Sequence, residues 1–224
     1  ASGARAHPRS ELHVTLAVRR DDTELRAGIE RWLGRGVHNI SRPAPGFSCE
    51  TVIVDDELVV RLPPLEDGTF PVYDLELQAA VQNAVAAAGV PVARATFVAN
   101  PEFLGVPFMT MPFIAGPIPS DFTPSDKWLA GLPNDEARAT VWATTIDAIV
   151  AISDVPYEGL TLRTGVDAEL AYWRAYLDWP PDPPVALRDP LVLVRAHRPT
   201  PLPAANLPHG GRRSPPPLSP APRR

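Results

Sequence analysis

The chain has 224 residues, of which 45% are hydrophobic and 21% are charged, and this ordinary globular usage excludes wholesale disorder and a coiled coil. Its net charge of −5 at pH 7 supplies no basic field for a phosphate backbone, so we expect no nucleic-acid partner. The single cysteine, Cys49, excludes an internal disulfide, and no apolar run reaches the length of a membrane span. A cytoplasmic protein without a membrane partner is therefore predicted.

Helix and strand patterns alternate in the first half of the chain. Leu25, Ile29 and Trp32 recur at helical spacing, with Asp22 as a candidate N-cap and Gly34 as the end of the helix. Runs rich in Val, Ile and Leu, bounded by polar or proline-containing turns, predict strands. The downstream elements expected are strands at 37–43, 50–54 and 58–62, a helix at 72–88, and strands at 92–99 and 106–114.

The second half is predicted to be helical. Asn134 is a candidate N-cap for a helix that ends at Ile152, and 166–177 has a second helical pattern. Of the 29 prolines, 14 lie within 180–224, which predicts no regular structure there. The expected domains are an N-terminal extension at 1–22, a small lobe at 23–116, a partial helical large lobe at 117–205 and a disordered Pro- and Arg-rich tail at 206–224. The linker Ala115–Pro119 is predicted to be a hinge between the lobes.

A turn rich in small residues separates two of the predicted strands. It reads Gly46-Phe47-Ser48-Cys49-Glu50-Thr51, and its backbone N–H groups can approach a phosphate closely because Gly carries no side chain. An ordinary hairpin turn accounts for the same residues, since Gly and Ser dominate turns. The segment is a candidate phosphate loop only in combination with other signals.

Two charged residues follow this turn. Arg61 lies in an apolar strand, and alternation aims it to the face opposite Val60 and Leu62. Glu76, in the next helix, is a candidate partner that pairs with Arg61 in a bidentate geometry. A solvated helix acid is the alternative interpretation of Glu76.

The last strand of the small lobe runs into the linker and is a candidate contact for a nucleotide base. It extends from Gly105 to Gly116, and unpaired backbone groups at such an edge can bind a purine ring between aliphatic side chains. Pro112 removes one donor, which leaves the N–H groups of Phe113 and Ile114, beside Met111. An edge strand without a ligand is the alternative.

In this order, the segments resemble the aminoglycoside phosphotransferase-like family of the protein-kinase-like fold. The resemblance covers roughly residues 25–205 and implies an α+β, two-lobed fold with a five-stranded antiparallel small lobe containing one helix, followed by an incomplete helical large lobe. It also implies transfer of the γ-phosphoryl group of ATP or GTP, with Mg²⁺, to a hydroxyl of a small-molecule acceptor. The nucleotide-binding residues expected from it are Gly46, Phe47, Ser48, Cys49, Thr51, Arg61, Glu76, Met111, Phe113 and Ile114.

The resemblance ends near Asn206. The family's catalytic loop reads His-Gly-Asp with Asn five residues after the Asp, whereas this chain has His209-Gly210-Gly211 and, at the Asn place, Pro216. Because no Asp or Glu follows Asp189, we expect neither a catalytic carboxylate nor a metal ligand in this part of the chain. A changed reading frame, which truncates the large lobe, is our hypothesis; a polyproline ligand for a partner domain is the rival.

Three functional interpretations remain open from the sequence. The first is a family member whose phosphotransfer is defective because the catalytic loop is missing. The second is a non-catalytic nucleotide-binding module, which keeps the Gly46 turn, Arg61, Glu76 and the last strand. The third is an inert remnant, which should expose the apolar faces of the helices at 134–152 and 166–177.

Overall fold

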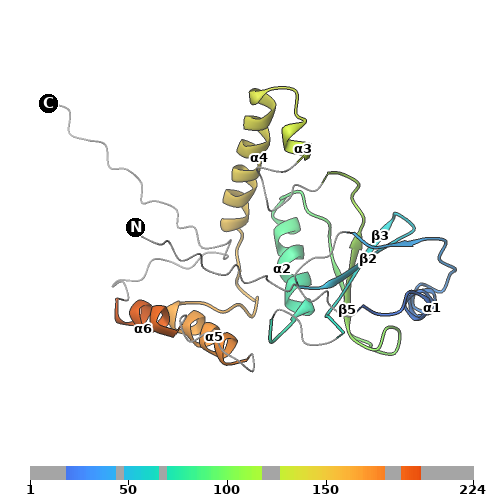
Figure 1. The fold of residues 1–224 in the computed structure, drawn as a ribbon, viewed down its shortest axis with the longest axis horizontal. Coiled ribbons are helices and arrows are strands. Elements are labelled where there is room, and N and C mark those ends of the chain that lie inside the picture. The colour runs from blue at the N-terminus through green and yellow to red at the C-terminus, as the bar shows by residue number, and fades with distance from the viewer. Residues whose placement is uncertain (1–18, 44–47, 66–69, 118–126, 180–187, 198–224) are drawn as a thin grey trace, which may run out of the picture.

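The computed structural model describes residues 19–43, 48–65, 70–117, 127–179 and 188–197. Its centre is a five-stranded antiparallel sheet in the order β1-β2-β3-β5-β4 (Figure 1). The strands are β1 (Ile40–Ser41), β2 (Glu50–Val54), β3 (Leu58–Leu62), β4 (Thr96–Val98) and β5 (Phe108–Pro112). The helices are α1 (Asp22–Leu33), α2 (Leu75–Ala87), α3 (Lys127–Ala130), α4 (Asp135–Ser153), α5 (Val166–Asp178) and α6 (Arg188–Ala196).

The predicted α+β class and the five antiparallel strands with an inserted helix are confirmed. The bounds of β2 and β3 agree with the prediction, whereas β1, β4 and β5 are shorter than the predicted runs. The structure also corrects one cap: the side chain of Asp21, not Asp22, accepts hydrogen bonds from the N–H groups of Thr23 and Glu24. Asp22 is the first helical residue, where a carboxylate stabilises the positive end of the helix dipole.

One face of the sheet packs against α1. Val52, Val60 and Phe108 are fully buried on this face, together with Leu25 and Ile29 of α1. The close approach depends on a glycine in α1. A Cβ at Gly28 would lie 2.3 Å from the carbonyl oxygen of Phe103, so no larger residue fits at this position without moving the backbone.

The opposite face of the sheet packs against α2. Leu75 and Ala79 of α2 are buried against Met109 of β5. The helix also carries a second apolar side, where Val85 packs against Val155 just beyond α4. The helix α2 therefore lies between the sheet and the helical half of the chain, as Figure 1 shows.

Two hydrogen bonds of the Asn83 side chain hold α2 to the segment before β4. The Asn83 amide nitrogen donates to the carbonyl oxygen of Ala95 at 2.8 Å, and its oxygen accepts from the Ala95 N–H at 2.8 Å. Pairing of β4 with β5 then begins at Thr96. In this register Ala95 would lie opposite Met111 and Arg94 opposite Pro112, which has no N–H to donate to a further hydrogen-bonded pair.

The helical half contains two elements that the sequence pattern does not predict, the short α3 and the helix α6. Proline enrichment from 180 onward predicts no regular structure, yet α6 occupies Arg188–Ala196. Pro190 lies in the first turn of α6, where a missing N–H leaves no helical hydrogen bond unmade. The predicted N-cap Asn134 is confirmed, because its side chain accepts from the N–H of Ala137 at 2.8 Å.

The helix α4 has no buried residue, and it projects from the rest of the structure in Figure 1. Trp142, Ile146 and Val150 follow one another at four-residue spacing, and each is about half exposed. On α5, Trp173 is also exposed. No helix of the described residues is both long and apolar enough to cross a bilayer. The predicted domain borders stay predictions; the extension up to residue 18, linker positions 118 and 119 and the tail lie outside the described residues.

The hairpin between β2 and β3 turns through Asp55 and Asp56. Both have positive φ, 52° and 54°, which Asp tolerates better than most residues. The Asp55 carboxylate accepts from the N–H groups of His38 and Asn39, both at 2.8 Å, and forms an ion pair with Arg35 at 2.7 Å. These donors, the Asn39 N–H foremost and then the Arg35 side chain, lower the pKa of Asp55 from 3.8 to about 2.

This pKa predicts a loss of stability in acid. A carboxyl whose pKa is lower in the folded chain stabilises the fold fully above its unfolded pKa of 3.8, and that contribution disappears as the pH falls towards about 2. Replacing Asp55 with Asn should therefore flatten the pH dependence of the urea midpoint in this window. Asp56→Asn is the matched control, because the Asp56 side chain has no hydrogen bond among the described residues. Equal slopes for the wild type and Asp55→Asn would contradict the assignment.

Candidate functional site

The predicted phosphate loop is described only at its ends. Gly46 and Phe47 lie outside the described residues, and Ser48 and Cys49 are half-buried where the chain enters β2. Cys49 packs against the α2 side of the sheet, next to the cluster that contains Leu75 and Met109.

One transverse row of the sheet contains two of the predicted site residues. Arg61 of β3 pairs with Thr51 of β2 on one side and with Met109 of β5 on the other, and Met109 pairs with Phe97 of β4. Paired residues of antiparallel strands lie on the same face of a sheet. Since Met109 is buried against Leu75 of α2, the row lies on the α2 face, as alternation along β3 predicts for Arg61.

Arg61 has no ion-pair partner among the described residues. Its side chain is half-buried in a row that otherwise contains Thr51, Met109 and Phe97. The predicted partner, Glu76, lies in the first turn of α2, is exposed, and forms no ion pair with Arg61. The structure thus brings Arg61 and Thr51 together and leaves Glu76 apart from them.

The end of β5 presents backbone groups on two sides. The Phe113 N–H donates to the carbonyl oxygen of Glu57 at 2.8 Å, so this predicted donor is already used on the β3 side. Backbone groups of successive residues in a strand point to alternate sides. The carbonyl of Pro112 and the N–H of Ile114 therefore point to the β4 side, where the pairing stops at Thr96. Among the described residues no acceptor is recorded for the Ile114 N–H.

Met111, the remaining predicted residue of β5, lies on the α2 face. The Gln82 amide nitrogen of α2 approaches its sulfur at 3.4 Å and also donates to the Ala93 carbonyl at 2.6 Å. Met111 is half-buried and stands one residue before the open edge. It can therefore flank a ligand held by the Pro112 and Ile114 backbone.

The sequence did not single out a cluster of charges at the entrance to β2. The Glu50 carboxylate forms ion pairs with Arg20 at 2.6 Å and with Arg42 at 2.5 Å. Arg42 also pairs with Asp22 at 2.7 Å. Burial opposes the charge on Arg42, but the hydrogen bonds to Glu50 and Asp22 outweigh it and raise its pKa. Arg42 shortly before the predicted loop and Glu50 within it are the sequence signal that could have revealed this cluster.

The described residues contain no preassembled metal site. No group of three or more His, Cys, Asp or Glu side chains gathers among them in a way that could hold a metal ion. Oxygen ligands from carboxylates are what Mg²⁺ prefers, so no step of the chemistry is assigned to a metal in this part of the chain.

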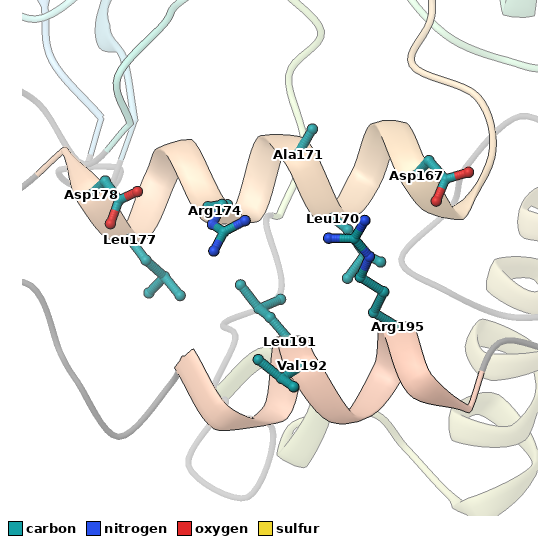
Figure 2. A pocket seen from close by; sticks show the side chains of 9 residues that line it. All are labelled: Asp167, Leu170, Ala171, Arg174, Leu177, Asp178, Leu191, Val192 and Arg195. Carbon is teal, nitrogen blue, oxygen red and sulfur yellow. The ribbon is translucent and has the colours of Figure 1, made fainter.

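A cavity of about 590 Å³ lies between α5 and α6 (Figure 2). Figure 2 shows Leu177 of α5 and Leu191 of α6 pointing into the space between the helices, and Arg195 of α6 extending towards Leu170 of α5. The predicted nucleotide residues are not among those lining it, because they lie on the sheet, on α2 and on the connections between them.

No protein-family model matches the chain. Among solved structures, the GDP complex of a point mutant of aminoglycoside 2′-phosphotransferase IIIa is 15% identical to it, with a TM-score of 0.48 over 77% of this chain and 57% of that chain. The GDP complex of the wild-type enzyme is 14% identical, with a TM-score of 0.45 over 75% and 55% of the two chains. The GDP and kanamycin complex of APH(2″)-IIIa is 18% identical, with a TM-score of 0.48 over 75% and 55%.

The chain therefore spans little more than half the length of these structures. By their names they are aminoglycoside phosphotransferases. GDP and kanamycin are ligands of those proteins.

Proposed function

We propose that the sheet and α2 form the nucleotide-binding lobe of an aminoglycoside phosphotransferase-like protein. The observation that carries the proposal is Arg61. A guanidinium that is half-buried without a counter-charge among the described residues is unfavourable unless an anion binds there. A nucleotide phosphate is such an anion, and the planar guanidinium matches its oxygens in a bidentate geometry.

At the end of β5, the backbone groups that face the β4 side are candidate contacts for a purine base. The Pro112 carbonyl is an acceptor and the Ile114 N–H is a donor on the same side of the chain. Adenine offers the complement, because its amino group donates beside a ring nitrogen that accepts. Met109 lies opposite Arg61, and Pro112 lies three residue steps further along β5. At 3.4 Å per residue, the distance between these two positions is about 10 Å. The ribose fills this interval between base and phosphates.

We propose ATP as the preferred nucleotide over GTP on the same ground. Guanine presents an acceptor oxygen beside a ring N–H donor, the reverse of the adenine order. The order of the two backbone groups therefore favours adenine, and Pro112 is compatible with this arrangement because only its carbonyl is used.

The chemical step that the family carries out is phosphoryl transfer to a hydroxyl of a small molecule. We propose that this chain does not accelerate it appreciably. Positioning and charge neutralisation supply most of the acceleration in phosphoryl transfer. Gly211 and Pro216 stand at the places of the family's Asp and Asn, and no cluster of three or more metal-ligating side chains is found among the described residues. Similarity of fold does not identify the acceptor molecule.

An inert chain is the second candidate, and one observation favours it. The exposed Trp142, Ile146 and Val150 of α4 are the apolar face that this interpretation predicts. Exposed patches of this kind promote association. Nucleotide binding separates the two candidates, since an inert chain has no reason to bind ATP at the sheet.

The test is titration of the purified chain with ATP and GTP, each with and without Mg²⁺, alongside a measurement of phosphate release. We expect metal-independent binding, tighter for ATP than for GTP, without turnover. A folded chain that binds neither nucleotide would support the inert candidate. Turnover would instead establish an active phosphotransferase and overturn the proposed loss of activity.

A further inference from the structure

The ends of three strands meet where the predicted phosphate contacts lie. Backbone pairing between β1 and β2 comprises Ile40 with Val54 and Ser41 with Ile53, and then stops. Pro43 follows directly after Arg42 and cannot donate to a continuing ladder. Beyond Ser41, the backbone therefore no longer holds β1 against the entrance of β2.

Side chains connect the end of β1 to the start of β2. Arg42 Nη1 donates to Glu50 Oε1 at 2.5 Å, and the two side chains are 13% and 7% exposed. Extension of the β1–β2 register places both residues on the same sheet face as diagonal neighbours, within reach of long side chains. Arg42 is fixed from behind as well, because Nε and Nη2 donate to Asp22 Oδ1 at 2.9 and 2.7 Å.

A second arginine extends the connection to β3. The Arg20 backbone N–H donates to Glu50 Oε1 at 3.1 Å, and its Nη1 donates to Oε2 at 2.6 Å. The same Nη1 donates to the carbonyl oxygen of Pro63 at 2.9 Å. Pro63 directly follows β3 and lies two residues after Arg61. Glu50 thus ties the start of β2 to the end of β1 and to the strand that carries Arg61.

We propose that Arg20, Arg42 and Glu50, the strand-end clamp, position Ser48 and Thr51 against Arg61 for a nucleotide polyphosphate. The inference rests on the proposed function and assigns the clamp a positioning role, without contact to the ligand. Groups fixed before binding lose little entropy when the ligand arrives, so preorganisation increases affinity. The buried carboxylate fits this role, because removing it leaves two guanidiniums that can separate the strand ends.

The clamp makes a prediction that an ordinary structural ion pair does not. It acts on the phosphate end of the site, whereas the purine contacts of Pro112 and Ile114 lie at the other end of β5. Replacing Glu50 with Gln should lower the affinity for ATP about tenfold and leave the affinity for adenosine unchanged. A purely structural role would weaken both ligands together or neither.

Calorimetric titration of ATP and adenosine, without added metal, measures this ratio on wild type and on Glu50→Gln, after circular dichroism has established that both are folded. Glu57→Gln is the matched control, since Glu57 also pairs with an arginine, at 3.2 Å, but is 71% exposed at the hairpin end. Its ratio should equal that of the wild type. If Glu50→Gln does not fold, Asp22→Asn removes only the outer partner of Arg42 and should lower the ratio two- to threefold, roughly.

The outcomes separate this inference from the proposed function. If the wild type binds ATP and the clamp variants have the same ratio of ATP affinity to adenosine affinity as the wild type, the positioning role of the clamp is wrong. The proposed nucleotide site is not affected by that result. Wild type that is folded and binds no ATP overturns both. A ratio that falls in the clamp variants and not in Glu57→Gln establishes the positioning role.

Discussion

Replacing Phe108 with alanine is expected to remove about 3–5 kcal/mol from the free energy of unfolding. The side chain is fully buried in β5, on the face that packs against α1, and its ring meets Trp32 of α1 edge to face, with centroids 5.2 Å apart. Truncation leaves a cavity between sheet and helix and also removes the favourable ring contact. Urea denaturation, followed by tryptophan fluorescence, measures the loss.

Phe103→Ala is the matched control for this prediction, because the same ring is removed from a half-buried position beside the same core cluster. It should destabilise the chain less than Phe108→Ala does. Phe108→Leu retains part of the ring's volume and should fall between the two. A loss at Phe103 equal to or larger than the loss at Phe108 would contradict the central role of Phe108 in this core.

The elements predicted best from sequence are those whose ends coincide with residues of special backbone chemistry. The bounds of β2 and β3 follow from apolar runs that stop at the Asp55–Asp56 turn and at Pro63, and the start of α4 follows from the Asn134 cap. The strands β1 and β4 are shorter than their apolar runs because a ladder continues only where both segments can hydrogen-bond. The ladder of β4 approaches Pro112 on its partner strand, which the local pattern of β4 does not include, whereas the ladder of β1 stops before Pro43 of its own segment.

The site was predictable to the extent that it depends on alternation within one strand. Side chains of successive residues in a strand alternate between the two faces of the sheet, which predicts that Arg61 lies on the face opposite Val60. The structure has Arg61 on that face. Glu76 depends instead on the rotation of α2, which is set by the burial of Leu75 and Ala79 against Met109, a contact distant in sequence. The Glu50 cluster joins residues about 8 and 30 positions away along the chain, so no local pattern contains it.

Replacing Arg61 with alanine is expected to lower ATP affinity on the order of 10–100-fold, the loss associated with hydrogen bonds to a charged group. Arg94→Ala is the matched control, because Arg94 is exposed just before β4 and has no ion pair among the described residues. Arg61→Lys keeps the charge but loses the planar fork, so its affinity should fall between wild type and Arg61→Ala.

The thermal behaviour of Arg61→Ala is what distinguishes a ligand-binding cation from a structural one. Because Arg61 has no ion pair among the described residues, its removal should not lower the melting temperature of the nucleotide-free chain. Saturating ATP should then raise the melting temperature of wild type and of Arg94→Ala, since a ligand that binds only the folded state stabilises it. The same ATP should raise that of Arg61→Ala by much less. A large drop in the nucleotide-free melting temperature, with the ATP shift intact, would show instead that Arg61 serves the fold and that phosphate binds elsewhere.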